Sequence, residues 1–319
     1  MYQRLLLSWL SSITAAFTVL WPGLICGLVA GWQQAGAVVV ASGGPNNTVP
    51  GGQPFFDNVG AIGLASAIYL GDGWVLSANH VAPSLPESVN FGGINYATQA
   101  GSFHRLENPA YSSTLTLLTD IVVFRLSTPP ALPGLDISTA TPMVGSQVMM
   151  IGNGRTQIGP PTYWDRTEIT GDSNDTWLET SEALSNIAGY QTTGTHEIRW
   201  GENVVNADDF TANTDNGDVI SFSTQFDAAG LAHEAQAVSG DSGGAVFSYN
   251  AGTWELSGMI HAVSTYETQP GGTETAMFGA ETAIADLSAY RSQILTIIPE
   301  PATAALAMLG GLALIRRRR

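Results

Sequence analysis

The sequence predicts an all-β protein, a barrel or a sandwich, with one α-helix near its C-terminal end. Short apolar or alternating runs recur along the chain, and Gly, Pro, Asn or Asp residues separate them. Only one stretch has the periodicity of a helix. With 36 glycines, 44% hydrophobic and 12% charged residues, the composition is that of a globular protein. Many short strands with such turns are typical of antiparallel β architectures.

Nine runs have the length and pattern of strands. In chain order they are residues 61–70, 73–81, 120–126, 146–154, 196–205, 218–226, 243–249, 253–263 and 275–282. Residues 158–195 are polar and poorly patterned, and we expect long surface loops there. Residues 38–58, which are rich in Gly, Pro and Asn from residue 42 on, predict an N-terminal arm or linker.

The predicted helix covers residues 283–298, AIADLSAYRSQILTII. Its apolar residues recur at spacings of three and four, and so share one face. They are Ile284, Leu287, Tyr290, Ile294 and Ile298. We expect this face to pack against the β body.

The first 37 residues predict a secretory signal. Arg4 precedes a long apolar stretch, which ends in Ala35-Gly36-Ala37. Cleavage is expected after Ala37, with Ala41 as the second choice. Because the apolar stretch is long, an uncleaved membrane anchor is the alternative.

The last residues, 299–319, carry Pro-Glu-Pro, an apolar stretch and four arginines. The apolar stretch is short for a membrane helix, which needs about 20 residues. In this order of features the tail resembles the PEP-CTERM sorting signal, which an exosortase processes in bacteria. An ordinary tail anchor is the alternative, and both place the folded part outside the cytoplasmic membrane. The resemblance implies an export machinery and an exosortase-type enzyme as partners, and a secreted or cell-surface location.

Charge and cysteine content exclude several functions. The chain has no lysine, and residues 38–298 hold 6 of the 11 arginines and 26 of the 27 acids. Such a negative field repels nucleic acid and anionic membranes, so we expect membrane contact only through the terminal segments. The one cysteine, Cys26, lies in the predicted signal, which excludes thiol catalysis and thiolate metal sites in the mature protein.

The stretch GDSGG places Ser242 among three glycines. A serine hydroxyl is a poor nucleophile unless a base takes its proton. Glycines let the backbone turn sharply, so that the N–H groups of Gly240 and Ser242 could stabilise an oxyanion.

A base and an orienting acid stand earlier in the chain. GDGWVLSANHV puts His80 at the end of an apolar strand, and TDIVVFRL puts Asp120 at the start of another. A carboxylate there is costly to bury unless it is hydrogen-bonded, for instance by an imidazole. Asp136 is the alternative acid. The remaining histidines, His104, His196, His233 and His261, are expected to be structural or exposed.

VLSANHV, TDIVVFRL and GDSGGAVF resemble the three motifs around the catalytic residues of chymotrypsin-like (trypsin-like) serine proteases, in the same chain order. The resemblance covers about residues 60–298. It implies two antiparallel β-barrels, at about 59–138 and 139–298, the second including the C-terminal helix. It also implies a Ser-His-Asp triad of Ser242, His80 and Asp120, an oxyanion hole at Gly240 and Ser242, a protein or peptide substrate and no cofactor.

The chain departs from this family in ways that matter. Asn79 and Val81 flank the histidine, Ala245 follows the glycines, and no IVGG-type start is present. Asp241 then needs another partner if it is buried. By analogy with bacterial relatives, Arg155 is the candidate.

The resemblance also implies a substrate pocket. Gln236, six residues before Ser242, would lie at its floor, and because it is neutral we expect no preference for Lys or Arg. Val263 would narrow the mouth and favour small residues. A one-residue shift would instead bring His261 to the pocket, as in glutamate-specific relatives.

The prediction is therefore an exported serine endopeptidase without a metal ion. The alternatives are a surface-anchored binding or structural protein on a silent protease fold, and an esterase, for which the G-x-S-x-G elbow is missing. The acidic stretch DDFTANTDNGD, residues 208–218, is expected to be solvated, although oxygen-rich loops of this kind can hold calcium.

Overall fold

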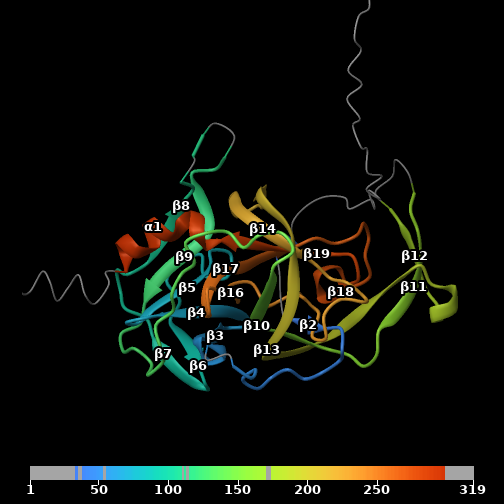
Figure 1. Cartoon of the computed structure of the whole chain (residues 1–319), viewed down its shortest axis with the longest axis horizontal. Coiled ribbons are helices and arrows are strands. Elements are labelled where there is room, and N and C mark those ends of the chain that lie inside the picture. Colours follow the sequence, from blue (N-terminus) through green and yellow to red (C-terminus); the bar gives the residue numbers. More distant parts are fainter. Residues whose placement is uncertain are drawn as a thin grey trace, which may run out of the picture.

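The computed structural model describes residues 33–34, 38–52, 55–109, 111–112, 115–169 and 174–298 (Figure 1). Within these ranges the chain is mostly β-strand, with one α-helix, α1 (Leu287–Ile297), near the end. The prediction of an all-β fold with a C-terminal helix is confirmed. Most of the predicted signal and all of the predicted sorting tail lie outside the described residues. No helix in the described ranges is long and apolar enough to cross a membrane.

The first half of the chain forms a seven-stranded antiparallel sheet in the order β7-β6-β3-β4-β5-β9-β8. Thr98, which directly follows β7, forms an isolated bridge with Leu126, which directly follows β9. This bridge joins the β7 and β9 ends of the sheet and curves it toward a barrel. The strands are β3 (Val59–Ile62), β4 (Ala65–Gly71), β5 (Trp74–Ala78), β6 (Ser88–Phe91), β7 (Ile94–Ala97), β8 (His104–Glu107) and β9 (Leu118–Arg125).

The second half forms a ten-stranded sheet, and six of its strands close into a ring. They run in the order β10-β16-β17-β19-β14-β13, and β10 also pairs with β13. Their bounds are β10 (Gln147–Gln157), β13 (Ile187–Ala212), β14 (Val219–Gln225), β16 (Ala245–Asn250), β17 (Thr253–Val263) and β19 (Glu281–Asp286). The two halves are thus two barrel-like sheets, as predicted.

Shorter elements extend the second sheet or connect the strands. β11 (Thr162–Thr167), β12 (Thr176–Glu179), β18 (Thr275–Met277) and β1 (Gln33–Gln34) join its edges. β2 (Val39–Val40) pairs separately with β15 (Ala235–Gln236). Three 3-10 helices are formed by Phe56–Asn58, Glu182–Leu184 and Gly272–Glu274.

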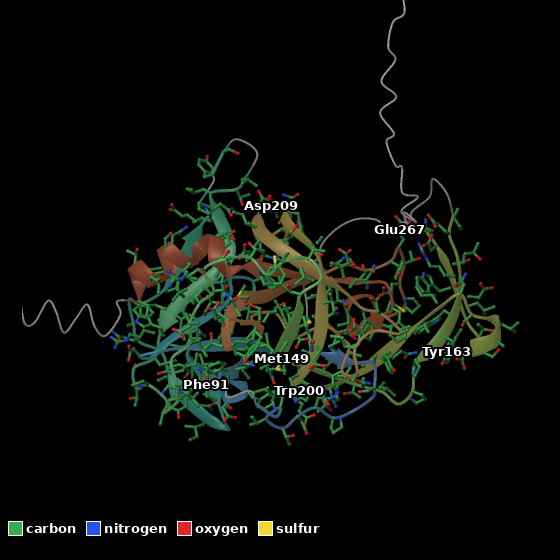
Figure 2. All side chains as sticks on the ribbon, viewed as in Figure 1. Phe91, Met149, Tyr163, Trp200, Asp209 and Glu267 are labelled. Carbon is green, nitrogen blue, oxygen red and sulfur yellow. The ribbon has the colours of Figure 1, made fainter. Side chains whose placement is uncertain are left out.

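One apolar core joins both sheets and the helix. It holds Ile68 and Leu76 from the first sheet, Met149 and Phe247 from the second, and Tyr290 from α1. Figure 2 labels Met149 on β10, near the middle of the molecule. Burying apolar surface on both sheets at once fixes how they dock, and with it the geometry of any site between them.

The helix begins later than its periodicity predicts. Residues 281–286 form β19, and Ile284 packs inside the second barrel rather than on the helix. Asp286 ends the strand, and its Oδ1 accepts the Ser288 N–H at 2.9 Å, which caps the first turn. The apolar spacing alone did not reveal that cap.

The segment expected to form long surface loops contains strands. Within the described part of the stretch 158–195 lie β11, β12 and the start of β13, and Trp164, Trp177 and Ile187 pack there against Tyr266. The partner lies about 90 positions away, so short-range periodicity did not predict it. At the start of the predicted arm, Val38, Val39 and Val40 are fully buried.

Candidate active site

His80 and Asp120 meet because β5 and β9 are neighbouring antiparallel strands. Ala78, two residues before His80, lies opposite Ile121, the residue after Asp120. Asp120 Oδ2 lies 2.6 Å from His80 Nδ1, and Asp120 Oδ1 accepts the His80 backbone N–H at 2.9 Å. The carboxylate is 1% exposed. It therefore holds both the ring and the backbone of His80 in one orientation.

The other ring nitrogen, His80 Nε2, is the one that could act as a base. It is buried, and it has no hydrogen-bond partner among the described residues. Because Asp120 engages Nδ1, a neutral ring would carry its proton on Nδ1 and leave the lone pair on Nε2.

Ser242 lies in the loop between β15 and β16, and it is 2% exposed. It lines a hollow of about 260 Å³ together with His80, Gly240 and Leu64. The wall thus comes from both sheets. Two larger hollows lie elsewhere. One is lined by Tyr163 and Phe278 among others, the second lies beside α1, and neither is lined by a histidine. The structure therefore brings Ser242, His80 and, behind it, Asp120 to one pocket.

Ser66 of β4 fixes the loop that carries Ser242. Its N–H donates to Ser242 O at 3.0 Å, and its hydroxyl donates to Gly240 O at 2.9 Å. The same hydroxyl accepts the N–H of Asn153 at 2.8 Å. The first sheet thus orients a loop of the second. Sequence reasoning missed Ser66, because a serine within a predicted strand carries no signal that distinguishes it from other serines.

Three glycines around Ser242 leave no room for a side chain. A Cβ at Gly240 would lie 2.6 Å from Leu64 O, and one at Gly244 would lie 2.6 Å from Ile151 O. A Cβ at Gly243 would press on Ser66 O, and Gly240 and Gly243 have φ of 111° and 86°. Such φ values favour glycine. The backbone at Gly240 and Ser242, the predicted oxyanion hole, therefore packs too closely on its neighbours to accept a side chain at the three glycines.

Asp241 is fully buried against Gly152, and its Oδ2 accepts the Val238 N–H at 3.3 Å. Within the described ranges its Oδ1 has no hydrogen-bond partner. Burial raises the pKa of this carboxyl well above its usual value, while the Val238 N–H and the Arg199 charge act in the opposite direction.

The predicted pairing of Asp241 with Arg155 is wrong. Arg155 extends to the half-exposed Glu274, with Nη2 2.6 Å from Oε1, and also donates to Thr193 O. The positive charge that acts on Asp241 is Arg199. Arg199 lies opposite Gly152 in the β10–β13 register, and Gly152 is the residue that Asp241 packs on. Arg199 comes near Asp241 only through the long-range pairing of β10 with β13, which the sequence motifs do not show.

Gln236, His261 and Val263, the predicted pocket residues, are all buried. They are not among the described residues that line the hollow shared by His80 and Ser242. Gln236 Nε2 donates to Glu281 O at 3.3 Å, and Val263 packs inside the second barrel. Their role in specificity stays a prediction.

His261 lies in the interior, with Nε2 3.1 Å from Ser221 Oγ. Burial lowers its pKa to about 4, and the nearby charges of Asp120 and His80 act on it in opposite directions. The imidazole is therefore neutral near pH 7.

Asp136 lies away from His80 and Ser242, whereas His196 lies beside them. Asp136 lines the hollow beside α1 and is not the partner of His80. His196, expected to be structural or exposed, lines the pocket of Ser242.

Among the described residues, no group of three His, Cys, Asp or Glu side chains lies close enough to hold a metal ion. In the acidic stretch 208–218, Asp218 is buried and its carboxylate accepts the Thr116 N–H and binds the Asn213 amide.

No protein-family model matches the chain, and no curated protein matches it. Among solved structures, the chain is similar to neuropsin, a serine protease expressed in the limbic system of mouse brain. The two are 15% identical with a TM-score of 0.44, and the match covers 79% of this chain and 98% of that one. A similarity of this size identifies neither the family nor the activity of the chain.

Proposed function

We propose that this chain is an exported serine endopeptidase that uses Ser242, His80 and Asp120. One observation carries the proposal. Asp120 holds the His80 ring through Nδ1, and Nε2 is left beside the pocket that Ser242 lines. The three motifs that resemble chymotrypsin-like proteases supply the same three residues independently of the coordinates.

The proposed reaction begins with attack of Ser242 Oγ on a peptide carbonyl carbon. His80 Nε2 takes the hydroxyl proton, and the carbonyl oxygen becomes an oxyanion. The proton then passes to the leaving amine, the C–N bond breaks, and an acyl-enzyme remains. Water, deprotonated by the same nitrogen, then attacks the ester carbonyl. The bond between the acyl carbon and Ser242 Oγ breaks, His80 returns the proton to Ser242 Oγ, and the acid is released. Proton transfer of this kind contributes about 10²–10⁴ in rate.

The N–H groups of Gly240 and Ser242 would bind the oxyanion. Removing one such donor costs about 10²–10³ in rate in other enzymes. Ser66 contributes as a positioning residue, because its bonds to Gly240 O and Ser242 O set the direction of the Gly240–Asp241 and Ser242–Gly243 peptide groups. The reaction needs no cofactor.

The exported location and the processing partners rest on the two chain ends. The proposed signal is removed after Ala37, and an exosortase-type enzyme processes the Pro-Glu-Pro tail. The proposed substrate is a protein or a peptide. The strongly acidic body of the chain disfavours nucleic acid as a partner.

A fluorophosphonate probe tests the nucleophile. We expect the chain to be labelled, and we expect the label to vanish in Ser242→Ala and in His80→Ala. Ser127→Ala, an exposed serine of the first sheet, is the matched control and should label like the wild type. Digestion of a peptide library should then give internal cleavage that Ser242→Ala lacks.

Other outcomes point elsewhere. Label that survives Ser242→Ala would show that another residue reacts. A correctly folded chain that is neither labelled nor active would favour the surface-anchored binding or structural protein. Labelling with ester hydrolysis but no peptide cleavage would favour the esterase.

A further inference from the structure

The hollow that Ser242 lines has two unlike walls. The first half of the chain supplies an apolar wall, made of Ile62, Leu64, Ala65 and Val81. The second half supplies a polar wall, which includes Arg155 and His196. A substrate residue that enters this hollow therefore meets hydrocarbon on one side and nitrogen atoms on the other.

Arg155 and His196 are neighbours across two strands. They lie directly opposite each other in the β10–β13 register, so their side chains share one face of the sheet. His196 Nδ1 lies 3.3 Å from the carbonyl oxygen of Asn153, which orients the ring. A Cβ on Gly240 would lie 2.7 Å from the same Nδ1. The pair thus stands directly beside the loop that carries Ser242.

Three residues that line this hollow each have a buried nitrogen with no hydrogen-bond partner among the described residues. The atoms are His80 Nε2, Arg155 Nε and His196 Nε2. A buried polar atom without a partner costs free energy, which a suitable group of the substrate can recover. The proposed reaction uses His80 Nε2 as the base. It gives no role to the other two nitrogens.

The guanidinium of Arg155 is held in place but keeps a donor for another group. Its Nη2 lies 2.6 Å from Glu274 Oε1, and its Nη1 donates to Thr193 O at 3.3 Å. A guanidinium has five N–H groups, so the N–H at Nε is left over. The side chain of Glu274 is 50% exposed, and an ion pair of this kind is weak. The charge of Arg155 is therefore only partly compensated.

We propose that Arg155 and His196 form a subsite for a carboxylate of the substrate, and that the chain prefers an Asp or Glu side chain close to the bond it cleaves. The inference rests on the proposed function and adds its substrate class. A carboxylate accepts charge-assisted hydrogen bonds from a guanidinium, and from an imidazole that carries both protons. This subsite differs from the pocket predicted from the sequence, because Gln236, His261 and Val263 are not among the described residues that line this hollow.

The charge of the whole chain makes such a local cation necessary. Residues 38–298 hold 26 acids and 6 arginines, and this field repels acidic peptides. An acidic substrate residue is therefore accepted only where a positive group beside the nucleophile offsets the repulsion. Arg155 is the one arginine among the described residues that line the hollow.

The test compares peptide pairs that differ only by Glu or Gln at one position near the cleaved bond, with the full chain as enzyme. We expect one position at which kcat/KM for the Glu peptide exceeds that for the Gln peptide by about tenfold or more, mainly through KM. Peptides with an amidated C-terminus should show the same ratio. Equal rates at every position would overturn the proposal. A preference confined to a free C-terminal carboxylate would overturn the assignment to a side chain.

Two substitutions should shift the Glu-to-Gln ratio in opposite directions. Arg155→Gln should bring the ratio close to one, whereas Glu274→Gln removes a competing carboxylate and should raise it by about threefold. A poorly folded variant would lose both peptides alike and leave the ratio unchanged. Arg125→Gln, at an exposed arginine of β9, is the matched control and should keep the wild-type ratio. A Glu preference that survives Arg155→Gln would place the subsite elsewhere and overturn the proposal.

Binding to the Ser242→Ala variant separates this proposal from the proposed function. Calorimetry should give a Kd for the Glu peptide about tenfold below that of its Gln twin, and the difference should vanish when Arg155→Gln is added. A wild-type chain that neither takes the fluorophosphonate label nor cleaves, while this difference in Kd persists, would overturn the proposed function and support the subsite. Equal Kd values in a chain that does cleave would overturn the subsite alone.

Discussion

Asp120 accepts two hydrogen bonds from the same residue, one from the backbone N–H of His80 at 2.9 Å and one at its ring Nδ1 at 2.6 Å. The two carboxylate oxygens thus fix both the position of the His80 main chain and the rotation of its ring. Because the carboxylate is only 1% exposed, it has few other hydrogen-bond partners available.

Asp120→Asn should leave the fold intact and lower kcat by about 10⁴-fold, because the amide would favour the wrong tautomer of His80. Steady-state hydrolysis of a peptide substrate measures this, with circular dichroism to check the fold. Asp136→Asn, at the hollow beside α1, is the control and should stay within about twofold of the wild type. If the two substitutions cost equally, the assignment of the acid is wrong.

Gly243→Ala should remove activity by displacing the nucleophile loop, since its Cβ would press on Ser66 O. Gly252→Ala is a matched control. Gly252 also has a positive φ, 94°, but a Cβ there meets nothing within 4 Å. Both variants should lose about 1 kcal/mol or more from backbone strain. Only Gly243→Ala should also lose kcat, which paired denaturation and rate measurements can separate. Loss of kcat in both would mean that strain at a remote turn reaches the site.

Ser66→Ala should lower both stability and rate. The Ser66 hydroxyl donates to Gly240 O and accepts the Asn153 N–H, and leaving these groups unpaired costs about 1–3 kcal/mol. A small displacement of the Ser242 loop should lower kcat by about tenfold to 10²-fold, with KM little changed.

Ser102→Ala is the control for that substitution. The Ser102 hydroxyl also donates one bond and accepts one, to Gln99 O and from the Arg125 N–H, but far from the loop. Its stability should fall by a similar amount while kcat stays at the wild-type value. A normal kcat in Ser66→Ala would remove Ser66 from the site.

His261 should make the protein sensitive to acid. Its pKa falls from 6.5 to about 4 on burial, so folding favours the neutral ring. Its contribution to stability is therefore fully present above pH 6.5 and is lost as pH falls toward 4. Each pKa unit is about 1.4 kcal/mol, so the loss approaches about 3 kcal/mol.

The difference in unfolding free energy between wild type and His261→Gln, measured in urea at several pH values, isolates this contribution from those of other groups. The glutamine variant should show a flatter dependence between pH 6.5 and 4. Parallel curves for the two proteins would mean that the imidazole titrates at its ordinary pKa in the fold.

The sequence motifs predicted that His80, Asp120 and Ser242 would lie together, because short motifs contain the residues that do chemistry. The motifs did not predict the residues that support the site. Ser66, Gly152 and Arg199 acquire their roles through contacts with residues that lie 40 or more positions away in the chain. The wrong partner for Asp241 has the same cause.

The fold class was predictable and the details of several elements were not. Alternation and turn residues predict strands wherever one face is buried. They failed at 158–195, where the buried Trp164 and the partly buried Trp177 pack with Tyr266 from a distant segment, and at Ile284, which fits a helical spacing but lies in β19.

The bond between Ser66 and Gly240 spans 174 positions and joins the two halves of the molecule. The geometry around the nucleophile therefore exists only after both halves have been synthesised and have docked. A nascent or partly unfolded chain carries the serine but not the arrangement that would make it reactive. For the proposed endopeptidase, this dependence on long-range assembly would keep unfolded copies from cleaving one another.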